Sequence, residues 1–229
     1  MQAVHPEQAP RRRRGTPHAA ALSAVALAVV AALGCAGMPS SDELDKEADA
    51  AMRMSFRDQG IAKADRVKQD ANQHACSVDK PLPEATAASL MADAKATVKW
   101  PAGGRYIGDW REGEKIAQNG RGFTWTDSSG ATGSGGGSCY NCHQIGKAEI
   151  SFGNIGPSLY NYGKNRGVAD ITSPTAAPIV QYTWMKIWNS RTFSACSTMP
   201  RFGHGGLMTE AQIRDVMALL LDPKSPVNQ

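Results

Sequence analysis

The sequence predicts a mainly helical protein whose C-terminal half forms one small domain. Two segments near opposite ends of that half, 112–119 and 209–221, carry small or apolar residues at the spacing of helices that pack on one face. Between them, Cys139 and Cys142 are followed directly by His143. Two end helices with a cysteine–histidine motif between them define the architecture that we expect.

Cys139, Cys142 and His143 form the attachment motif of a c-type haem. Residues three apart on a helical turn lie about 60° apart around the helix axis, so both sulfurs reach the vinyl groups on one haem edge. His143 follows on the same turn and is expected to bind the iron. A Cys-x-x-Cys pair alone also suits a zinc knuckle or a thioredoxin-type dithiol, and the histidine favours haem. We therefore expect one covalent haem c inside a class I cytochrome c fold.

The segment 1–34 is expected to be a signal peptide that is not part of the fold. It has a basic run at 11–14, an apolar run at 19–33 and small residues at its end. The apolar run is too short to span a membrane as a helix. Haem attachment to an unfolded, exported chain favours the general secretory route, with the twin-arginine route as the alternative. Both routes lead to the periplasm.

Removal of this leader changes the charge of the chain. The leader holds four arginines and one glutamate, so the formal net charge falls from +4 to +1 without it. The mature chain shows no basic stripe with interleaved aromatic residues, which argues against nucleic acid as a partner.

Cys35 has two interpretations. Ala32 to Cys35 resembles a bacterial lipobox, in which the cysteine becomes a lipid-bearing N-terminus. A lipid would attach the protein to a membrane without a spanning helix. The alternative is ordinary signal cleavage after Ala36, which discards Cys35.

Cys76 and Cys196 remain after the other cysteines are assigned. A disulfide between them is the economical interpretation in an oxidising compartment. The alternative is Cys196 as a haem or zinc ligand.

The segment 35–100 is predicted to be an N-terminal helical extension. Its first part, 42–73, reads as helical and mostly polar, and a second helix is expected over 84–98. A cluster of proline and glycine follows at 100–104, which we interpret as the boundary of the cytochrome c domain, 101–229.

The two end helices of that domain are expected to cross closely. Gly113 and Ala117 place small residues on one face of the first helix, and Thr209 with Gln212 forms a capping box at the start of the last. The glycine-rich run 128–138 is expected to be a flexible loop that leads into the attachment turn.

Met199 is predicted to fill the second axial position on the iron, because Pro200 stiffens the irregular run that must hold a weak thioether. His204 is the main alternative, since imidazole binds iron more strongly. Met185 falls in a helical pattern and Met208 directly precedes the last helix, so both are expected to pack in the core. A filled position indicates an electron carrier, and an open one a haem enzyme or sensor.

Other residues are candidates for the surroundings of the haem. The run 156–159 is interpreted as a turn whose carbonyl accepts the second ring proton of His143, with a plain turn as the alternative. Four aromatic residues either line the haem or belong to ordinary core: Tyr160, Tyr162, Trp184 and Trp188. Five basic residues either ring an exposed edge that attracts an acidic partner or a sulfur oxyanion, or are solvated surface: Lys147, Lys164, Arg166, Arg191 and Arg201.

The chain resembles a known family beyond the haem motif. The matching runs are the segment around Cys139, then 155–163, 182–188, 195–203 and 215–223. Together they resemble SoxX, the monohaem subunit of the SoxAX cytochrome complex of bacterial sulfur oxidation. The most specific run is Cys-Ser-Thr-Met-Pro-Arg-Phe-Gly, from Cys196 to Gly203.

This resemblance implies a class of function. It implies that Met199 is the distal ligand and that the partner is a SoxA-type subunit. In SoxAX, an L-cysteine S-thiosulfotransferase, thiosulfate is joined oxidatively to a cysteine of a SoxYZ-type carrier protein. The X subunit passes the electrons to a small cytochrome c, so no catalytic residue is expected on this chain. A free-standing carrier, the haem subunit of another dehydrogenase, and a haem enzyme or sensor with an open sixth site are the alternatives.

Overall fold

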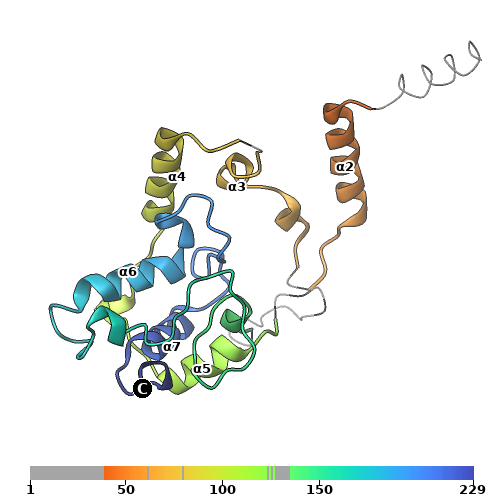
Figure 1. The fold of residues 1–229 in the computed structure, drawn as a ribbon. Helices are drawn as coiled ribbons and strands as arrows, with labels where there is room; N and C mark the ends of the chain where they lie inside the picture. Colours follow the sequence, from red (N-terminus) through yellow and green to blue (C-terminus); the bar gives the residue numbers. More distant parts are fainter. Residues whose placement is uncertain (1–38, 61, 79, 123, 125, 127–134) are drawn as a thin grey trace, which may run out of the picture. The chain divides into compact units, whose positions relative to one another are not determined.

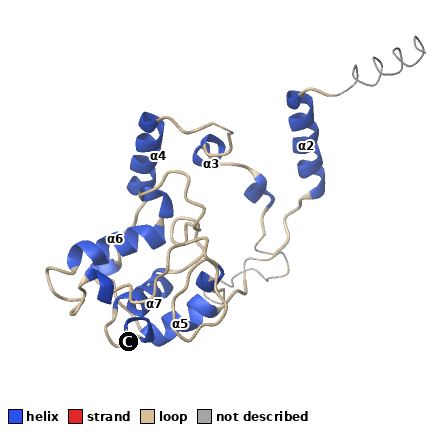
Figure 2. Ribbon diagram, in the orientation of Figure 1, coloured by secondary structure: helices blue, strands red, loops and turns tan. Residues whose placement is uncertain are grey.

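The computed structural model describes residues 39–60, 62–78, 80–122, 124, 126 and 135–229. The predicted signal peptide, Cys35 and most of the glycine-rich run lie outside this part. The described residues form α-helices and short 3-10 turns and contain no strand (Figure 2). The mainly helical class is therefore confirmed. None of the described helices is long and apolar enough to cross a membrane.

The chain divides into two compact units, 1–55 and 56–229. In the first unit, the described helix is α2 (Ser41–Ser55). The second unit contains α3 (Ala71–Ala75), α4 (Glu84–Ala96), α5 (Trp110–Gln118), α6 (Ala177–Trp188) and α7 (Glu210–Leu221) (Figure 1).

The helix expected over 42–73 is wrong beyond Ser55, where α2 ends. Gly60 then adopts a positive φ of 54°, which a helix does not contain. A new helix, α3, begins after Asp70, whose side chain accepts from the Gln73 amide in a capping box. The polar composition of this stretch concealed the turn at the glycine and the second start signal.

Helices α5 and α7 cross closely, as the small residues predicted. A methyl group added at Gly113 would overlap the backbone of Asp215, so the glycine permits the approach. The Gly108 amide donates to the Arg214 carbonyl at 2.9 Å beside this crossing. The capping box of Thr209 and Gln212 is confirmed at the start of α7. This crossing fixes the C-terminal end of α5, and the haem motif lies beside that end.

The main core lies between α6 and α7. Trp184 on α6 and Ile213, Met217 and Leu221 on α7 are fully buried there. The indole of Trp184 donates to the Lys99 carbonyl at 2.9 Å. This bond ties Lys99, three residues after the end of α4, to the same core.

Packing therefore continues across the boundary proposed at 100–104. The indole of Trp188 donates to the Thr97 carbonyl at 3.1 Å, and Ala94 on α4 is buried. Residues 56–100, assigned to an extension from the sequence, belong to the same compact unit as the predicted cytochrome domain.

Candidate haem attachment site

The haem motif forms a tight turn that lies beside the C-terminal end of α5. Cys139–Asn141 is a 3-10 turn, and the His143 amide donates to the Cys139 carbonyl at 2.9 Å. Ser138 enters the turn with a positive φ of 48°. The Gly137 amide donates to the Ile116 carbonyl of α5 at 2.8 Å. The three motif residues are thus brought together on one turn that is anchored to a packed helix.

The two thiols of the motif are not joined to each other. Cys139 and Cys142 are both free and half-buried. Burial raises the pKa of the Cys139 thiol to about 12. Reactive dithiols of the thioredoxin type need the opposite shift, since their thiolate is the nucleophile. The burial of Cys139 therefore disfavours its thiolate form.

The imidazole of His143 is held in one orientation. Its Nδ1 atom lies 2.7 Å from the Pro157 carbonyl oxygen, which only accepts, so Nδ1 carries the proton. The predicted hydrogen bond from His143 to a carbonyl of the 156–159 turn is confirmed. Nε2 then carries the free lone pair that a metal ligand requires.

Gly156 forms a seat for this ring. A methyl group added at Gly156 would overlap the imidazole of His143, so only glycine allows the ring to lie against the backbone here. The Gly156 amide also donates to the Cys142 carbonyl at 2.8 Å. The glycine therefore positions both the ring and the turn that bears it.

The loop around this glycine runs beside the attachment turn. The Gly153 amide donates to the Tyr140 carbonyl at 2.8 Å, and the Leu159 amide to the Gln144 carbonyl at 2.7 Å. Backbone groups of the attachment turn and of the 153–159 loop thus form hydrogen bonds with one another. These bonds add local support to a turn that is also anchored on α5 through Gly137.

Met199 lies in an irregular loop that packs against the main core. Its side chain is half-buried, and its carbonyl accepts from the Ser190 hydroxyl at 2.6 Å. The amides of Gly203 and His204 both donate to the Trp188 carbonyl, which fixes the far end of the loop on α6. Met199 as the second iron ligand stays a prediction.

The other candidates for this ligand have different surroundings. Met208 is buried in the main core, as expected. Met185 lies on α6 and is half-buried. The His204 side chain is exposed, and desolvation and the positive charge of Arg201 lower its pKa.

The aromatic candidates take structural roles in the described contacts. Trp184 and Trp188 stack with ring centroids 5.8 Å apart. The hydroxyls of Tyr162 and Thr183 share a hydrogen bond of 2.8 Å. Tyr162, Trp184 and Trp188 are all buried in the main core, and whether they also line the haem stays a prediction.

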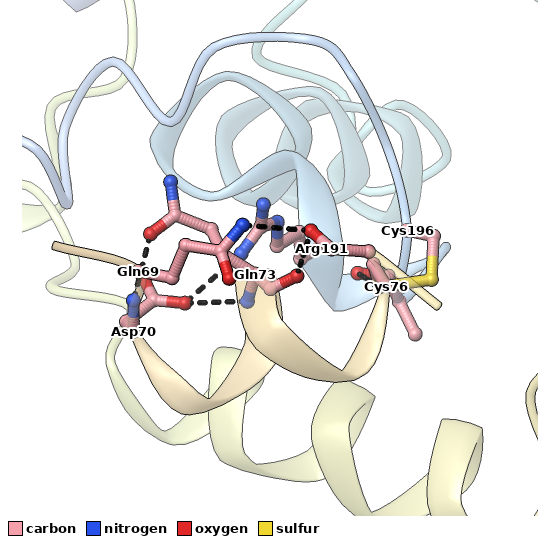
Figure 3. Close-up of a disulfide and its surroundings, with 8 residues drawn as sticks. Gln69, Asp70, Gln73, Cys76, Arg191 and Cys196 are labelled. Carbon is pink, nitrogen blue, oxygen red and sulfur yellow. Dashed lines mark hydrogen bonds and ion pairs between the residues drawn. A yellow bond between two sulfur atoms is a disulfide. The ribbon is translucent and has the colours of Figure 1, made fainter. Parts of the chain in front are cut away.

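Cys76 and Cys196 form a disulfide, as predicted (Figure 3). Cys196 is thereby excluded as a haem or zinc ligand. The bond joins the C-cap of α3 to the loop that carries Met199.

An ion-pair cluster next to this disulfide was missed by the sequence analysis. Asp70 lies 2.7 Å from Arg201 and 3.4 Å from Arg191. Burial raises the pKa of the Asp70 carboxyl, but the Gln73 amide and Arg201 lower it more, so the net shift is downward. Asp70 and Gln73 have the spacing of a helix start, which the sequence shows. Nothing near Asp70 in the sequence indicates that it pairs with Arg191 and Arg201.

Three of the five candidate basic residues have intramolecular partners. Arg191 and Arg201 face Asp70. The guanidinium of Arg166 lies 3.7 Å from the centre of the Tyr162 ring. These contacts fix the three arginines to their own fold.

The donor set fits haem better than a zinc cluster. In the described ranges, no three His, Cys, Asp or Glu side chains gather to hold a metal ion. A structural zinc site needs four such ligands, whereas haem c needs two free thiols and one oriented histidine. Cys139, Cys142 and His143 meet the second requirement.

Comparison with known proteins supplies one relative. A protein of Aquifex aeolicus (strain VF5), described as an uncharacterized lipoprotein, is 39% identical to this chain over 163 residues. The match covers 70% of this chain and 73% of the relative. This chain belongs to the same family as that protein. No protein-family model matches it.

Proposed function

We propose that this chain is a monohaem c-type cytochrome that carries single electrons. The observation that carries the proposal is the His143 imidazole, which is fixed by the Pro157 carbonyl at 2.7 Å and seated on Gly156. This arrangement leaves Nε2 as the ligand atom and sets its direction. Such a preset ring next to two free thiols supports a covalently attached haem.

Each residue of the proposed site has a defined task. Cys139 and Cys142 would hold the haem as thioethers, and His143 and Met199 would bind its iron. A thioether ligand favours the reduced iron, so Met199 would raise the reduction potential. A haem bound here supplies a one-electron couple. The task of the chain is to hold that couple in a shielded, fixed geometry.

The finer proposal is a SoxX-like subunit of a SoxAX complex. It is supported by the run from Cys196 to Gly203 and by the other runs that resemble that family. In this role the chain accepts electrons released when thiosulfate is joined to a cysteine of a SoxYZ-type carrier. It then passes them to a small cytochrome c. A SoxA-type subunit is the partner that performs the chemistry.

We also propose a lipid anchor at Cys35 and a periplasmic location. The sequence Ala-Leu-Gly-Cys from Ala32 to Cys35 supports the anchor, and so does the description of the Aquifex relative as a lipoprotein. Mass spectrometry of the mature N-terminus tests this part. A lipid-modified Cys35 supports it, and cleavage after Ala36 overturns it.

The partner is tested by purification from cells grown on thiosulfate. The full chain, tagged at its C-terminus and produced with haem-attachment machinery, is expected to co-purify with a dihaem SoxA-type subunit. A haem-loaded chain that elutes alone contradicts the SoxX-like role and supports a free-standing carrier. A chain without haem contradicts the cytochrome itself.

A further inference from the structure

The segment before the predicted cytochrome domain makes a second set of contacts with the Met199 loop. Asp70 begins α3, and Cys76 ends it. Both face the loop that follows α6, where Arg191 and Cys196 lie (Figure 3). One short helix thus presents a carboxylate and a sulfur to the same loop.

The contacts bracket Met199 in the sequence. Cys196, three residues before it, is bonded to Cys76. Arg201, two residues after it, pairs with Asp70 at 2.7 Å. The Ser190 hydroxyl binds the carbonyl of Met199 itself at 2.6 Å. A loop held on both sides of one residue has little freedom to move that residue.

Asp70 also balances two like charges. Arg191 and Arg201 both lie within ion-pair distance of its carboxylate, and the Arg191 side chain is only 12% exposed. Without the carboxylate, two guanidinium groups would face each other beside the loop. A poorly solvated cation that loses its partner is strongly unfavourable, so the loop would be pushed outward.

We propose that Asp70 is a positioning residue that holds the Met199 loop closed through Arg201, with the Cys76–Cys196 disulfide as a second fastening. This inference rests on the proposed function, in which Met199 binds iron. A thioether is a weak ligand, so its bond to iron depends on how rarely the loop opens. A carboxylate outside the predicted cytochrome domain thereby controls access to the sixth position.

The test is the replacement of Met199 by added imidazole in the haem-loaded full chain. Imidazole binds only when the loop opens, so its apparent affinity follows the open fraction. Asp70→Asn removes the charge but keeps a side chain that caps α3 equally well. Asp93→Asn, at an exposed position on α4, is the matched control. Loss of the sulfur-to-iron charge-transfer band reports the exchange.

Asp70→Asn is expected to bind imidazole about tenfold more tightly than the natural protein, while Asp93→Asn stays within about twofold. Arg201→Gln breaks the same ion pair without leaving two guanidinium groups face to face, so it is expected to raise imidazole affinity less than Asp70→Asn does. The double variant is expected to resemble Arg201→Gln. Because Asp70→Asn and Arg201→Gln break the same ion pair, either one can test the proposal if the other folds poorly. A purely structural role would lower the unfolding midpoint in denaturant and leave imidazole affinity unchanged.

Two failures are distinguishable in this experiment. If the natural protein shows the charge-transfer band but Asp70→Asn binds imidazole no more tightly, the positioning role is overturned and the cytochrome stands. If the natural protein carries no haem or lacks the band, methionine ligation is overturned and the inference falls with it.

Discussion

The attachment turn and the Met199 loop are held in different ways. His143 takes its support from Pro157, which lies 14 residues further along the chain. The Met199 loop takes its support from Cys76, at a sequence separation of 120, and from Asp70 beside it. The first support is local and runs through a backbone carbonyl, whereas the second adds long-range side-chain contacts to local bonds with Ser190 and Trp188. The attachment turn can therefore be predicted from the sequence, whereas the support of the Met199 loop depends on the assembled fold.

The largest expected effect comes from removing the disulfide. Cys76→Ser with Cys196→Ser is expected to lower the free energy of unfolding by about 2–5 kcal/mol, because the bond closes a long loop. Denaturant unfolding followed by circular dichroism measures the change. The hydrogen bond of His143 should survive, since it is local. A loss below about 1 kcal/mol would show that other contacts suffice to hold the Met199 loop.

Gly156→Ala is expected to disrupt the opposite region. The added methyl group overlaps the His143 ring, so the ring must move away from the Pro157 carbonyl. We expect a loss of about 1–3 kcal/mol in stability and reduced haem content per chain. Absorption of the extracted protein measures haem content.

Gly146→Ala is the matched control for this prediction. It follows the attachment turn in sequence, but its added methyl group meets only the Tyr140 hydroxyl, at 3.2 Å. Equal effects of the two substitutions would contradict the proposed seat for the ring.

Ser190→Ala is expected to have a smaller effect, confined to the Met199 loop. It removes a hydrogen bond of 2.6 Å to the Met199 carbonyl, worth about 1 kcal/mol. Faster hydrogen exchange in 197–204, with no change in 139–144, is the expected pattern. Ser194→Ala, at an exposed position nearby, serves as the control. Exchange that rises equally in both regions would mean that the two are not held independently.

The smallest effect concerns pH. The folded pKa of Asp70 is lowered, since the Gln73 amide and the nearby arginines outweigh burial. A carboxyl with a lowered folded pKa binds fewer protons in the folded state than in the unfolded state. Its contribution to stability is therefore fully present above its unfolded pKa of about 4. The contribution is lost as pH falls through the folded pKa. The stability difference between the natural protein and Asp70→Asn should therefore shrink from pH ~6 to pH ~3. Unfolding midpoints across this range measure it, and a constant difference would contradict the ion pair.

The features predicted correctly from sequence have local signals, even where the contact joins distant segments, as at Gly113. The capping box at Thr209, the close crossing at Gly113 and the carbonyl partner of His143 each follow from a few neighbouring residues. The pairing of Cys76 with Cys196 followed from counting the remaining cysteines. Short motifs and a count of the remaining cysteines can be used without knowledge of the fold.

The features that sequence did not reveal depend on contacts between distant segments. Asp70 carries a readable helix start, but its pairing with Arg201 leaves no periodic pattern. Trp188 was a candidate haem neighbour, and its bond to Thr97 shows that it joins α4 to the core. The same packing makes 56–100 part of one unit with the domain that was expected to begin at 101.

The most direct test of the account is the mass of the mature full chain after acid and solvent extraction. When produced with haem-attachment machinery, the natural protein is expected to retain one haem, and a Cys139→Ser, Cys142→Ser variant none. A natural protein that loses all porphyrin on extraction, or that joins Cys139 to Cys142 in a disulfide, would contradict the central claim.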